Sequence, residues 1–400
     1  VEVSRGCPFL CEFCDIRVLP ENNKSNNKSP SLIVAEMDAH FRLGAQQFQF
    51  ACDNFIGDIQ WARDCVDAIL AWKKKTGAKI SIFTWLTINL YKLPDLMRKM
   101  REAGFSIVFI GIESVNQNSL LETAKVQNRG TIEKAILTIQ SYGFIIAPGF
   151  IFGFDSDPKT IFNDTLDFMM NIGMIGGDPS FLTALPGTPL YRRMERAGRL
   201  ASVYEEGTVR LKISTNILYL QDSDDLVSGF LHFLEIYNSP AYQLARFQRH
   251  LDCIEKSDNF IAIDGIGYGS PVEYLSMQLK NSENRKMLFR RLVFLLNNPS
   301  AIAAALKALW RLWRLSKKRA GIGIHFNYWF YVWTNLVLKY EGLQKTDFQL
   351  HSVGPDFDYR TLSSQRLTEE NSVSYRSTNG ETKVAHQQRY TQKALDKIIQ

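Results

Sequence analysis

Three cysteines near the start of the chain are the residues best suited to chemistry. Cys7, Cys11 and Cys14 form a C-x3-C-x2-C array, and Phe13 directly precedes the last cysteine. Three thiolates on one short loop suit a [4Fe-4S] cluster. Such a cluster normally takes four cysteine ligands, so a triad leaves one iron open to a ligand other than protein. We expect chemistry at that open iron.

Zinc is the alternative metal, because thiolates also bind it well. A closed structural zinc site takes four ligands, usually as two separated pairs. The remaining cysteines, Cys52, Cys65 and Cys253, are scattered singly along the chain. The pattern therefore favours an iron-sulfur cluster, with a zinc site or three buried cysteines as the other interpretation.

The elements that must position these cysteines alternate between short apolar runs and amphipathic stretches. This alternation predicts consecutive beta-alpha units and a parallel sheet. Right-handed crossovers would curl six such strands into a partial barrel with its active site at the carboxyl ends of the strands. The predicted strands are 1–4, 47–51, 79–85, 106–112, 144–152 and 178–184.

The stretch RGCPFLCEFC, residues 5–14, resembles the signature of the radical S-adenosylmethionine (SAM) superfamily. The fold of that superfamily is a six-stranded partial barrel, so the resemblance agrees with the strand pattern. It implies a [4Fe-4S] cluster held by Cys7, Cys11 and Cys14, with SAM bound at the open iron. The fold class expected is α/β: a partial (β/α)6 TIM-like barrel followed by a mainly α-helical accessory domain.

Strand ends carry the residues that the resemblance assigns to SAM. Asp53 and Asn54 follow the second strand, where the superfamily usually has a Gly-Gly-Glu-like motif that holds the methionyl ammonium. A simple turn is the alternative for this pair, because both residues readily hydrogen-bond their own backbone. Glu113 and Ser114 end the fourth strand and are expected at the ribose or the methionyl carboxylate.

The fifth strand carries Gly149, Ile151 and Gly153 in a loose pattern that resembles the adenine-contacting strand of the superfamily. Glycine in a strand allows the close approach of a flat ring. No side chain is singled out as catalytic. Because the acid of Glu113 emerges from an apolar strand, it should be paired or should face a ligand.

Within the superfamily, RGCPFLCEFCDI, FACDNFIGD and GIES most resemble the cobalamin-binding-domain-containing members, the branch of the hopanoid methylases. The resemblance implies cobalamin, bound by an N-terminal domain that we expect to lie outside this chain. It also implies methylation or related tailoring of an unactivated carbon. Cyclisation, epimerisation or rearrangement without methyl transfer is the alternative, and a non-catalytic iron-sulfur binding module is a further one.

The length of 400 residues exceeds one typical domain. We expect a barrel over 1–200, a linker over 201–220 and a helical accessory domain over 221–346. Residues 347–400 are rich in Ser, Thr, Gln and Asn, which predicts a largely disordered tail.

The net charge of +6 is mildly basic. Lys307, Arg311, Arg314 and Lys318 share one face of a predicted helix, beside Trp310 and Trp313. Such a helix suits a membrane surface, a nucleic acid or an acidic partner. A solvated helix packed by its tryptophans is the interpretation we favour, with peripheral membrane contact through 303–338, including the uncharged 320–338, as the alternative.

The expected partners follow from the resemblance and from these helices. They are a small-molecule or lipid-like substrate and a reducing electron donor such as flavodoxin or ferredoxin, and no specific nucleic acid is expected. An oxygen-sensitive cluster suits a reducing compartment, so the expected location is the cytoplasm, with peripheral contact at the inner membrane face as an addition.

Overall fold

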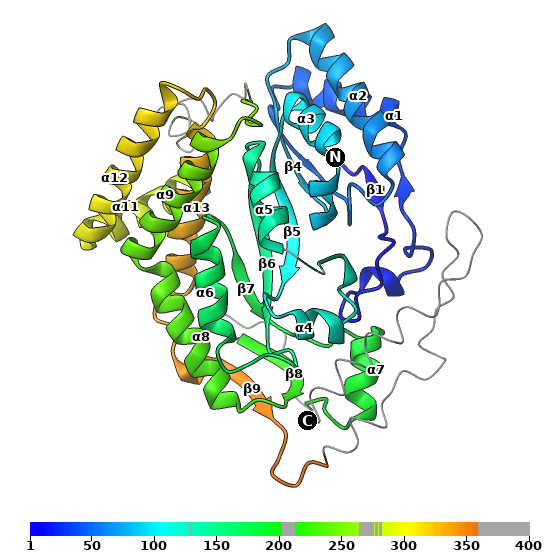
Figure 1. Ribbon diagram of the computed structural model, residues 1–400, viewed down its shortest axis with the longest axis vertical. Coiled ribbons are helices and arrows are strands. Elements are labelled where there is room, and N and C mark those ends of the chain that lie inside the picture. Colours follow the sequence, from blue (N-terminus) through cyan, green and yellow to red (C-terminus); the bar gives the residue numbers. More distant parts are fainter. Residues whose placement is uncertain are drawn as a thin grey trace.

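The computed structural model describes residues 1–128, 130, 132–201, 213–263, 276, 279 and 282–358. A parallel sheet of five strands, in the order β3-β4-β5-β6-β7, runs through the molecule (Figure 1). Each strand pairs with the next one along the chain, as expected for repeated beta-alpha units. The strands are β3 (Gln47–Phe50), β4 (Ser81–Trp85), β5 (Phe105–Glu113), β6 (Ile145–Phe152) and β7 (Asp178–Phe181).

The first predicted strand is only partly regular. Glu2 forms an isolated parallel bridge with Ala51, and the Val3 amide donates to the Ala51 carbonyl at 3.0 Å, so the chain start lies beside β3. The next residues form β1 (Ser4–Arg5), which pairs antiparallel with β2 (Asn26–Asn27). The predicted partial barrel is confirmed, with its first strand reduced to a bridge.

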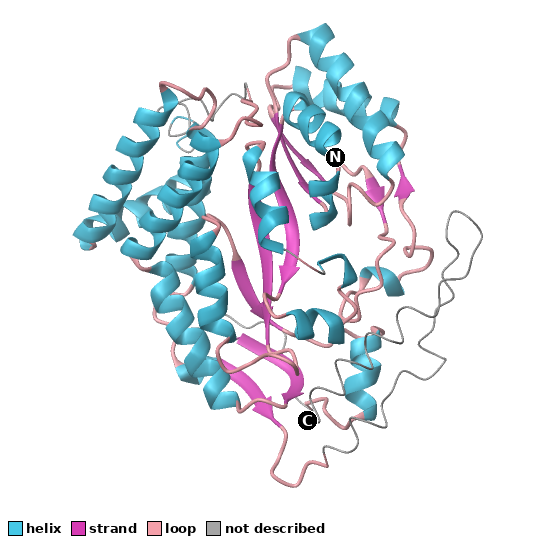
Figure 2. Cartoon of the chain, viewed as in Figure 1, coloured by secondary structure: helices cyan, strands magenta, loops and turns pink. Residues whose placement is uncertain are grey.

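Helices surround these strands (Figure 2). Those of the barrel are α1 (Pro30–Arg42), α2 (Ile59–Thr76), α3 (Pro94–Ala103), α4 (Gln117–Glu122), α5 (Ile132–Ser141), α6 (Ile161–Asn171) and α7 (Pro189–Arg196). Their limits follow local signals. For example, the Asp58 side chain accepts the Trp61 amide at the start of α2, and Gly77 ends that helix at φ +67°.

The two faces of the sheet differ in burial. Along β6, Ile146, Phe150 and Phe152 are buried, and Phe152 packs on Phe162 of α6. The alternate residues Ala147, Gly149 and Ile151 are half-buried, because strand side chains alternate between faces. This second set defines the inner face of the half-barrel.

The second half of the chain is mainly helical, as predicted. Its helices are α8 (Ser223–Asn238), α9 (Pro240–Lys256), α11 (Ser282–Asn297), α12 (Pro299–Ser316) and α13 (Gly323–Lys339). Two strands, β8 (Ile213–Tyr219) and β9 (Phe348–Ser352), pair parallel with each other. The expected linker thus contains β8, and the expected polar tail begins with β9. The rest of that tail from 359 onward lies outside the described residues.

The accessory helices share the barrel's hydrophobic core. Phe230, Phe233 and Tyr237 of α8 are buried in the same cluster as the strands. A second cluster joins Ile145 and Ile175 of the barrel region to α9, α12 and α13. The uncharged segment 320–338, for which peripheral membrane contact was the alternative, falls largely in α13, where Trp329 and Trp333 are fully buried.

The described residues include several apolar helices. No single helix there is long and apolar enough to cross a bilayer. Residues Arg285–Asn297 of α11 and Pro299–Ser316 of α12 pass a length and composition test only as a pair, and the pair is bent by 107°.

Candidate cofactor site

The cysteine loop begins at a backbone position that only glycine fits. Gly6 has φ +90°, and a Cβ there would collide with the carbonyl oxygen of Lys24. The Gly6 amide donates to Asp53 Oδ2 at 2.6 Å, and the Cys7 amide donates to the Asn22 carbonyl at 2.9 Å. Asp53 therefore fixes the entry to the loop, a contact that the assignment to SAM did not foresee.

Amide side chains point at two of the three sulfurs. Asn54 Nδ2 lies 3.8 Å from Cys7 Sγ, and Gln127 Nε2 lies 3.3 Å from Cys11 Sγ. The remaining amide oxygens of Asn54 and Gln127 are buried without a hydrogen-bond partner. Burial raises the pKa of the Cys7 thiol, and it raises that of Cys14 to about 11, helped by the neighbouring cysteines.

The donor set fits an iron-sulfur cluster chemically. Three thiols stand on one loop, and hydrogen bonds to cysteine sulfur are a common means of tuning such clusters. Within the described ranges, no group of three or more His, Cys, Asp or Glu side chains is gathered closely enough to hold a metal ion. The fit therefore rests on the identity of the donors and on the amides aimed at them.

Glu113 is paired, as its origin on an apolar strand requires. Its Oε1 accepts from Lys125 Nζ at 2.6 Å, and both side chains are buried. Burial alone would lower the pKa of Lys125, but the Glu113 carboxylate outweighs it and holds that pKa above its usual range. Lys125 Nζ also lies 5.9 Å from the centroid of the Phe13 ring, which places the ion pair beside the cysteine loop.

An irregularity at the end of β5 directs the Glu113 side chain into the candidate site. Glu113 has φ +65°, and the pairing of β5 with β6 shifts between Gly111 and Glu113. Its carboxylate then lies over Gly111, where any Cβ would collide with it. Asn128 braces the turn, because its Nδ2 donates to the carbonyls of Gly111 and Ile112 at 2.9 and 2.8 Å.

The other predicted contacts divide between two environments. A Cβ at Gly149 would lie 2.9 Å from Phe109 and 3.7 Å from Glu113 Oε2, so this glycine lies beside the Glu113 carboxylate. Ile151 is half-buried on the inner face. Gly153 instead lies against Tyr219, whose ring is 2.6 Å from where its Cβ would be.

Ser114 is buried in a turn of its own. Its Oγ accepts from the Asn116 amide at 3.1 Å, and the side chain is 2 % exposed. The hydroxyl therefore serves the chain locally, like other serines that follow a strand.

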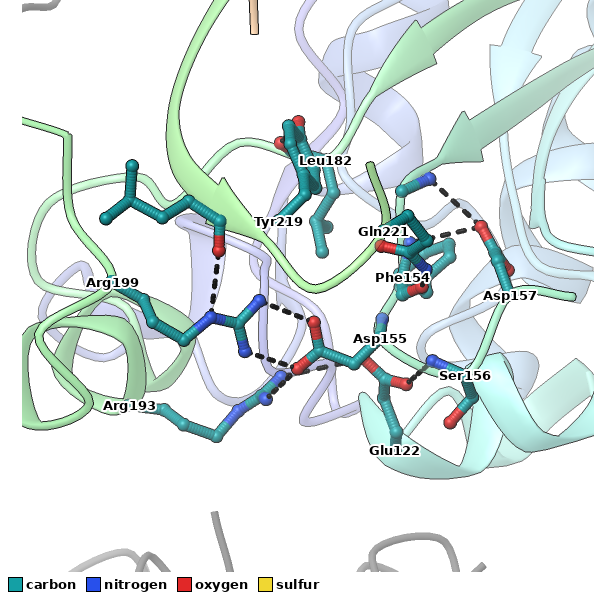
Figure 3. A network of polar contacts seen from close by, with 12 residues as sticks. Glu122, Phe154, Asp155, Ser156, Asp157, Leu182, Arg193, Arg199, Tyr219 and Gln221 are labelled. Carbon is teal, nitrogen blue, oxygen red and sulfur yellow. Dashed lines mark hydrogen bonds and ion pairs between the residues drawn. The ribbon is translucent and has the colours of Figure 1, made fainter. Parts of the chain in front are cut away.

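A buried ionic network ties the cysteine loop to the rest of the fold. Arg193 of α7 donates to both carboxylate oxygens of Glu12, each at 2.9 Å, and to Asp155 at 3.1 Å. Arg199 forms a second fork on Asp155 at 2.6 and 2.7 Å (Figure 3). Because Glu12 lies between Cys11 and Cys14, Arg193 of α7 clamps the cysteine loop from the end of the barrel.

Two further carboxylates have raised pKa values. Glu122 accepts the Asp155 and Ser156 amides (Figure 3). Burial, and after it the Asp155 charge, raises the Glu122 pKa to about 8. Asp157 accepts the Gly153 and Phe154 amides, and burial raises its pKa to about 7. Burial also acts on Asp155, but the two arginines hold its pKa below the usual value.

Sequence reasoning missed Glu12, Lys125, Asp155, Arg193 and Arg199. Glu12 could have been noticed, since it lies inside the cysteine array, and Lys125 stands just before the Gln127-Asn128 pair. The two arginines carry no local signal, because their partners are distant in sequence.

The comparison with protein families defines the class. Residues 1–169 match the family described as the radical SAM superfamily, and residues 188–346 match a domain of unknown function, DUF4070. The chain therefore carries a radical SAM domain, as the cysteine motif and strand order predicted. The prediction of a radical SAM enzyme agrees with this match, and its [4Fe-4S] cluster and SAM belong to the function proposed below.

The curated relatives include several methyltransferases. The chain is 33% identical over 253 residues to the hopanoid C-2 methylase of Rhodopseudomonas palustris (strain TIE-1), covering 62% of this chain and 46% of that protein. It is 28% identical over 196 residues to the bacteriochlorophyllide d C-12(1)-methyltransferase of Chlorobaculum tepidum, covering 48% and 41%. The chain thus spans about half the length of the curated relatives it matches.

Two similar solved structures contain bound cobalamin. The radical enzyme OxsB, with aqua-cobalamin and SAM bound, gives a TM-score of 0.45 at 16% identity, covering 100% of this chain and 57% of that chain. The methyltransferase TsrM from Kitasatospora setae, with cobalamin and a [4Fe-4S] cluster bound, gives 0.44 at 14% identity, covering 51% and 40%.

Proposed function

We propose that this chain is the radical SAM part of a cobalamin-dependent enzyme that methylates, or otherwise tailors, an unactivated carbon. The observation that carries the proposal is the cysteine loop, which stands at the carboxyl edge of a half-barrel with sulfur-directed amides around it. The methyltransferase relatives support methyl transfer as the reaction.

Cys7, Cys11 and Cys14 are proposed to hold the cluster, and Asn54 and Gln127 to donate hydrogen bonds to its cysteine sulfurs. Glu113, Gly149 and Ile151 line the adjoining inner face, where SAM would lie. Asp53 acts at the base of the loop, through the Gly6 amide. We assign cobalamin to no residue of this chain.

The protein's own task is positioning and exclusion of water. When bound by Cys7, Cys11 and Cys14, a cluster would supply the electron for reductive cleavage of SAM, and cobalamin held outside this chain would supply the methyl group. The Glu113–Lys125 pair gives the inner face a fixed carboxylate that can accept hydrogen bonds from hydroxyl or ammonium groups. The Glu12–Arg193 clamp keeps the cysteine loop rigid.

The inner face also suggests the substrate class. It presents half-buried apolar side chains, among them Phe83 and Trp85, whose rings meet edge to face at 4.6 Å. At its β7 edge, Asp178 accepts from Lys339 and Tyr340 of the accessory domain. These features support a small or lipid-like substrate held between the sheet and the accessory domain. A flavodoxin or ferredoxin is proposed as the reductant because the cluster needs an electron donor.

The test is anaerobic reconstitution of the full chain with iron and sulfide, followed by a reductant and SAM. Wild type should form 5'-deoxyadenosine and methionine. Cys11→Ala should lose the cluster's visible absorbance and both products, because one thiolate ligand is missing. Cys253→Ala is the matched control and should keep them, since Cys253 lies on α9, outside the cysteine loop.

Methyl transfer is tested on the protein together with the proposed cobalamin-binding domain, supplied with cobalamin and with SAM that carries a deuterated methyl group. S-adenosylhomocysteine beside 5'-deoxyadenosine would support the proposal. 5'-Deoxyadenosine alone would favour a cyclase, epimerase or rearrangement enzyme. A fully loaded cluster that cleaves no SAM would contradict radical chemistry and favour an iron-sulfur binding module.

A further inference from the structure

Helices α11 and α12 expose large apolar side chains on the outside of the molecule. On α12, Leu306, Trp310 and Trp313 are 61%, 57% and 57% exposed. They lie on one helical face, since they are spaced by three and four residues. The opposite face is buried through Ala301, Ala304, Ala305, Ala308, Leu312 and Leu315. The two tryptophans therefore do not pack the helix, contrary to the interpretation favoured from the sequence.

Helix α11 repeats the pattern. Phe289, Leu292, Val293 and Leu296 share a face by the same spacing, and Phe289 and Leu296 are 67% and 74% exposed. Both helices lie at the outer edge of the molecule, on the other side of the sheet from the N-terminal segment (Figure 1). Single exposed apolar residues are ordinary on protein surfaces, but a contiguous group on two adjacent helices marks an interaction site.

The charge of this segment has one sign. Residues 285–320 contain ten basic residues and no acidic residue. The structure divides the predicted basic face, because Arg311 and Lys318 form ion pairs with Asp252 or Glu255 of α9. Lys307, Arg314 and Lys317 are exposed on the apolar side of α12, with Arg314 over Trp310 and Lys317 over Trp313.

We propose that the exposed faces of α11 and α12 form a peripheral docking surface for an anionic lipid bilayer. Tryptophan, aliphatic and basic side chains together suit the boundary between headgroups and acyl chains. Charge complementarity selects this occupant. A second copy would set like charges against each other. A nucleic acid would leave the aliphatic face of α11 in water. This proposal does not depend on the SAM chemistry.

The test is flotation of the full chain with vesicles of phosphatidylcholine, with or without about a third phosphatidylglycerol. Wild type should float with the anionic vesicles and lose binding at high salt. Trp310→Ala with Trp313→Ala should weaken binding about tenfold or more. Lys307→Glu, Arg314→Glu and Lys317→Glu together should do the same.

Matched controls come from the other side of the fold. Leu43→Ala removes a side chain that is 85% exposed, and Lys74→Glu with Lys75→Glu reverses two exposed charges on α2. Both controls should bind within about twofold of wild type. Trp310→Phe with Trp313→Phe should keep binding, because it preserves an aromatic apolar face.

Three outcomes would overturn the proposal: no binding of wild type to anionic vesicles, patch variants that bind like wild type, or a self-associating chain whose dimer the Trp310→Ala and Trp313→Ala changes dissociate.

Discussion

At the scale of single residues, the site depends on a few side chains and glycines. The conformation of each has an identifiable physical cause. Glu113 adopts a left-handed φ because Asn128 holds the preceding carbonyls and Lys125 holds its carboxylate. Gly6 and Gly111 are required where a Cβ would collide with neighbouring oxygen atoms.

Gly6 offers a direct test with an internal control. Gly6→Ala should destabilise the fold by more than the roughly 1–2 kcal/mol of a left-handed alanine, because a collision with Lys24 is added. Gly44→Ala has a similar φ of +95° and no atom within 4 Å, so it measures the conformational cost alone. Urea unfolding should separate the two variants, and equal losses would show that the collision is relieved without cost.

Asp157 should impose a pH dependence on stability. Its pKa is raised from about 3.8 to about 7, so the folded chain retains a proton that the unfolded chain loses. The free energy of unfolding therefore falls as the pH rises from about 4 to about 7, by up to about 1.4 kcal/mol per pH unit from this group.

Asp157→Asn should remove that contribution while keeping acceptors for the Gly153 and Phe154 amides. Its stability relative to wild type should rise between about pH 4 and about pH 7 and then level off. The exposed Asp167→Asn is the control and should show no such trend. A pH-independent difference for Asp157→Asn would contradict the raised pKa.

At the scale of elements, the cysteine loop is held by segments that meet it from several directions. The Glu12 amide donates to the Thr123 carbonyl after α4, and the Leu190 amide of α7 donates to the Glu12 carbonyl. The loop after β6 contributes Asp155, which forms an ion pair with Arg193 of α7. Helix α7 thus supports the loop that we propose to hold the cluster.

Among the residues that hold the loop, Arg193 should be especially sensitive to substitution. Arg193→Met leaves the buried Glu12 and Asp155 charges without this partner and should cost about 3–5 kcal/mol of unfolding free energy. Arg193→Lys keeps the charge but loses the fork, so its cost should be smaller. Chemical denaturation measures both, and iron content after reconstitution reports on the loop. If Arg193→Met were as stable as wild type, the proposed role of Arg193 in holding the loop would be contradicted.

At the scale of the whole molecule, the barrel and the accessory helices are one packed body. The Arg101 guanidinium of α3 is fully buried and donates to the Ile261 carbonyl after α9. Tyr237 of α8 donates to the carbonyls of Gly176 and Gly177, just before β7. We therefore expect the two parts to unfold together.

A buried histidine pair at this junction makes the prediction specific. His250 Nε2 of α9 and His325 Nδ1 of α13 are 2.9 Å apart, and both rings are fully buried. Burial lowers the pKa of His250 to about 4 and that of His325 well below 6.5. The unfolded chain takes up protons that the folded chain does not, so stability should fall as the pH drops from about 6.5 toward 4.

His325→Leu should reduce the loss of stability at acid pH by up to about 1.4 kcal/mol per pH unit, as measured by thermal unfolding. His232→Gln, at an exposed histidine of α8, should leave it unchanged. Tryptophan fluorescence and far-ultraviolet circular dichroism should report one shared transition. Separate transitions would contradict a single packed body.

The sequence by itself determined the features that depend on short spacing. The cysteine array, the strand order and the position of the loop at the strand ends are local or periodic properties, so they were predictable. The need of Glu113 for a partner was also predictable, because an acid at the end of an apolar strand cannot stay unpaired. The identity of that partner, Lys125, was not.

Only the tertiary structure decided the contacts between distant segments. Arg193 meets Glu12 across 181 positions, and β8 pairs with β9 although helices α8, α9, α11, α12 and α13 lie between them in the chain. It also decided which tryptophans are buried: Trp329 and Trp333 lie in the core, whereas Trp310 and Trp313, which were expected to pack their helix, are exposed. Periodicity identifies a face of a helix, but the neighbouring elements determine whether that face meets the core or the surroundings.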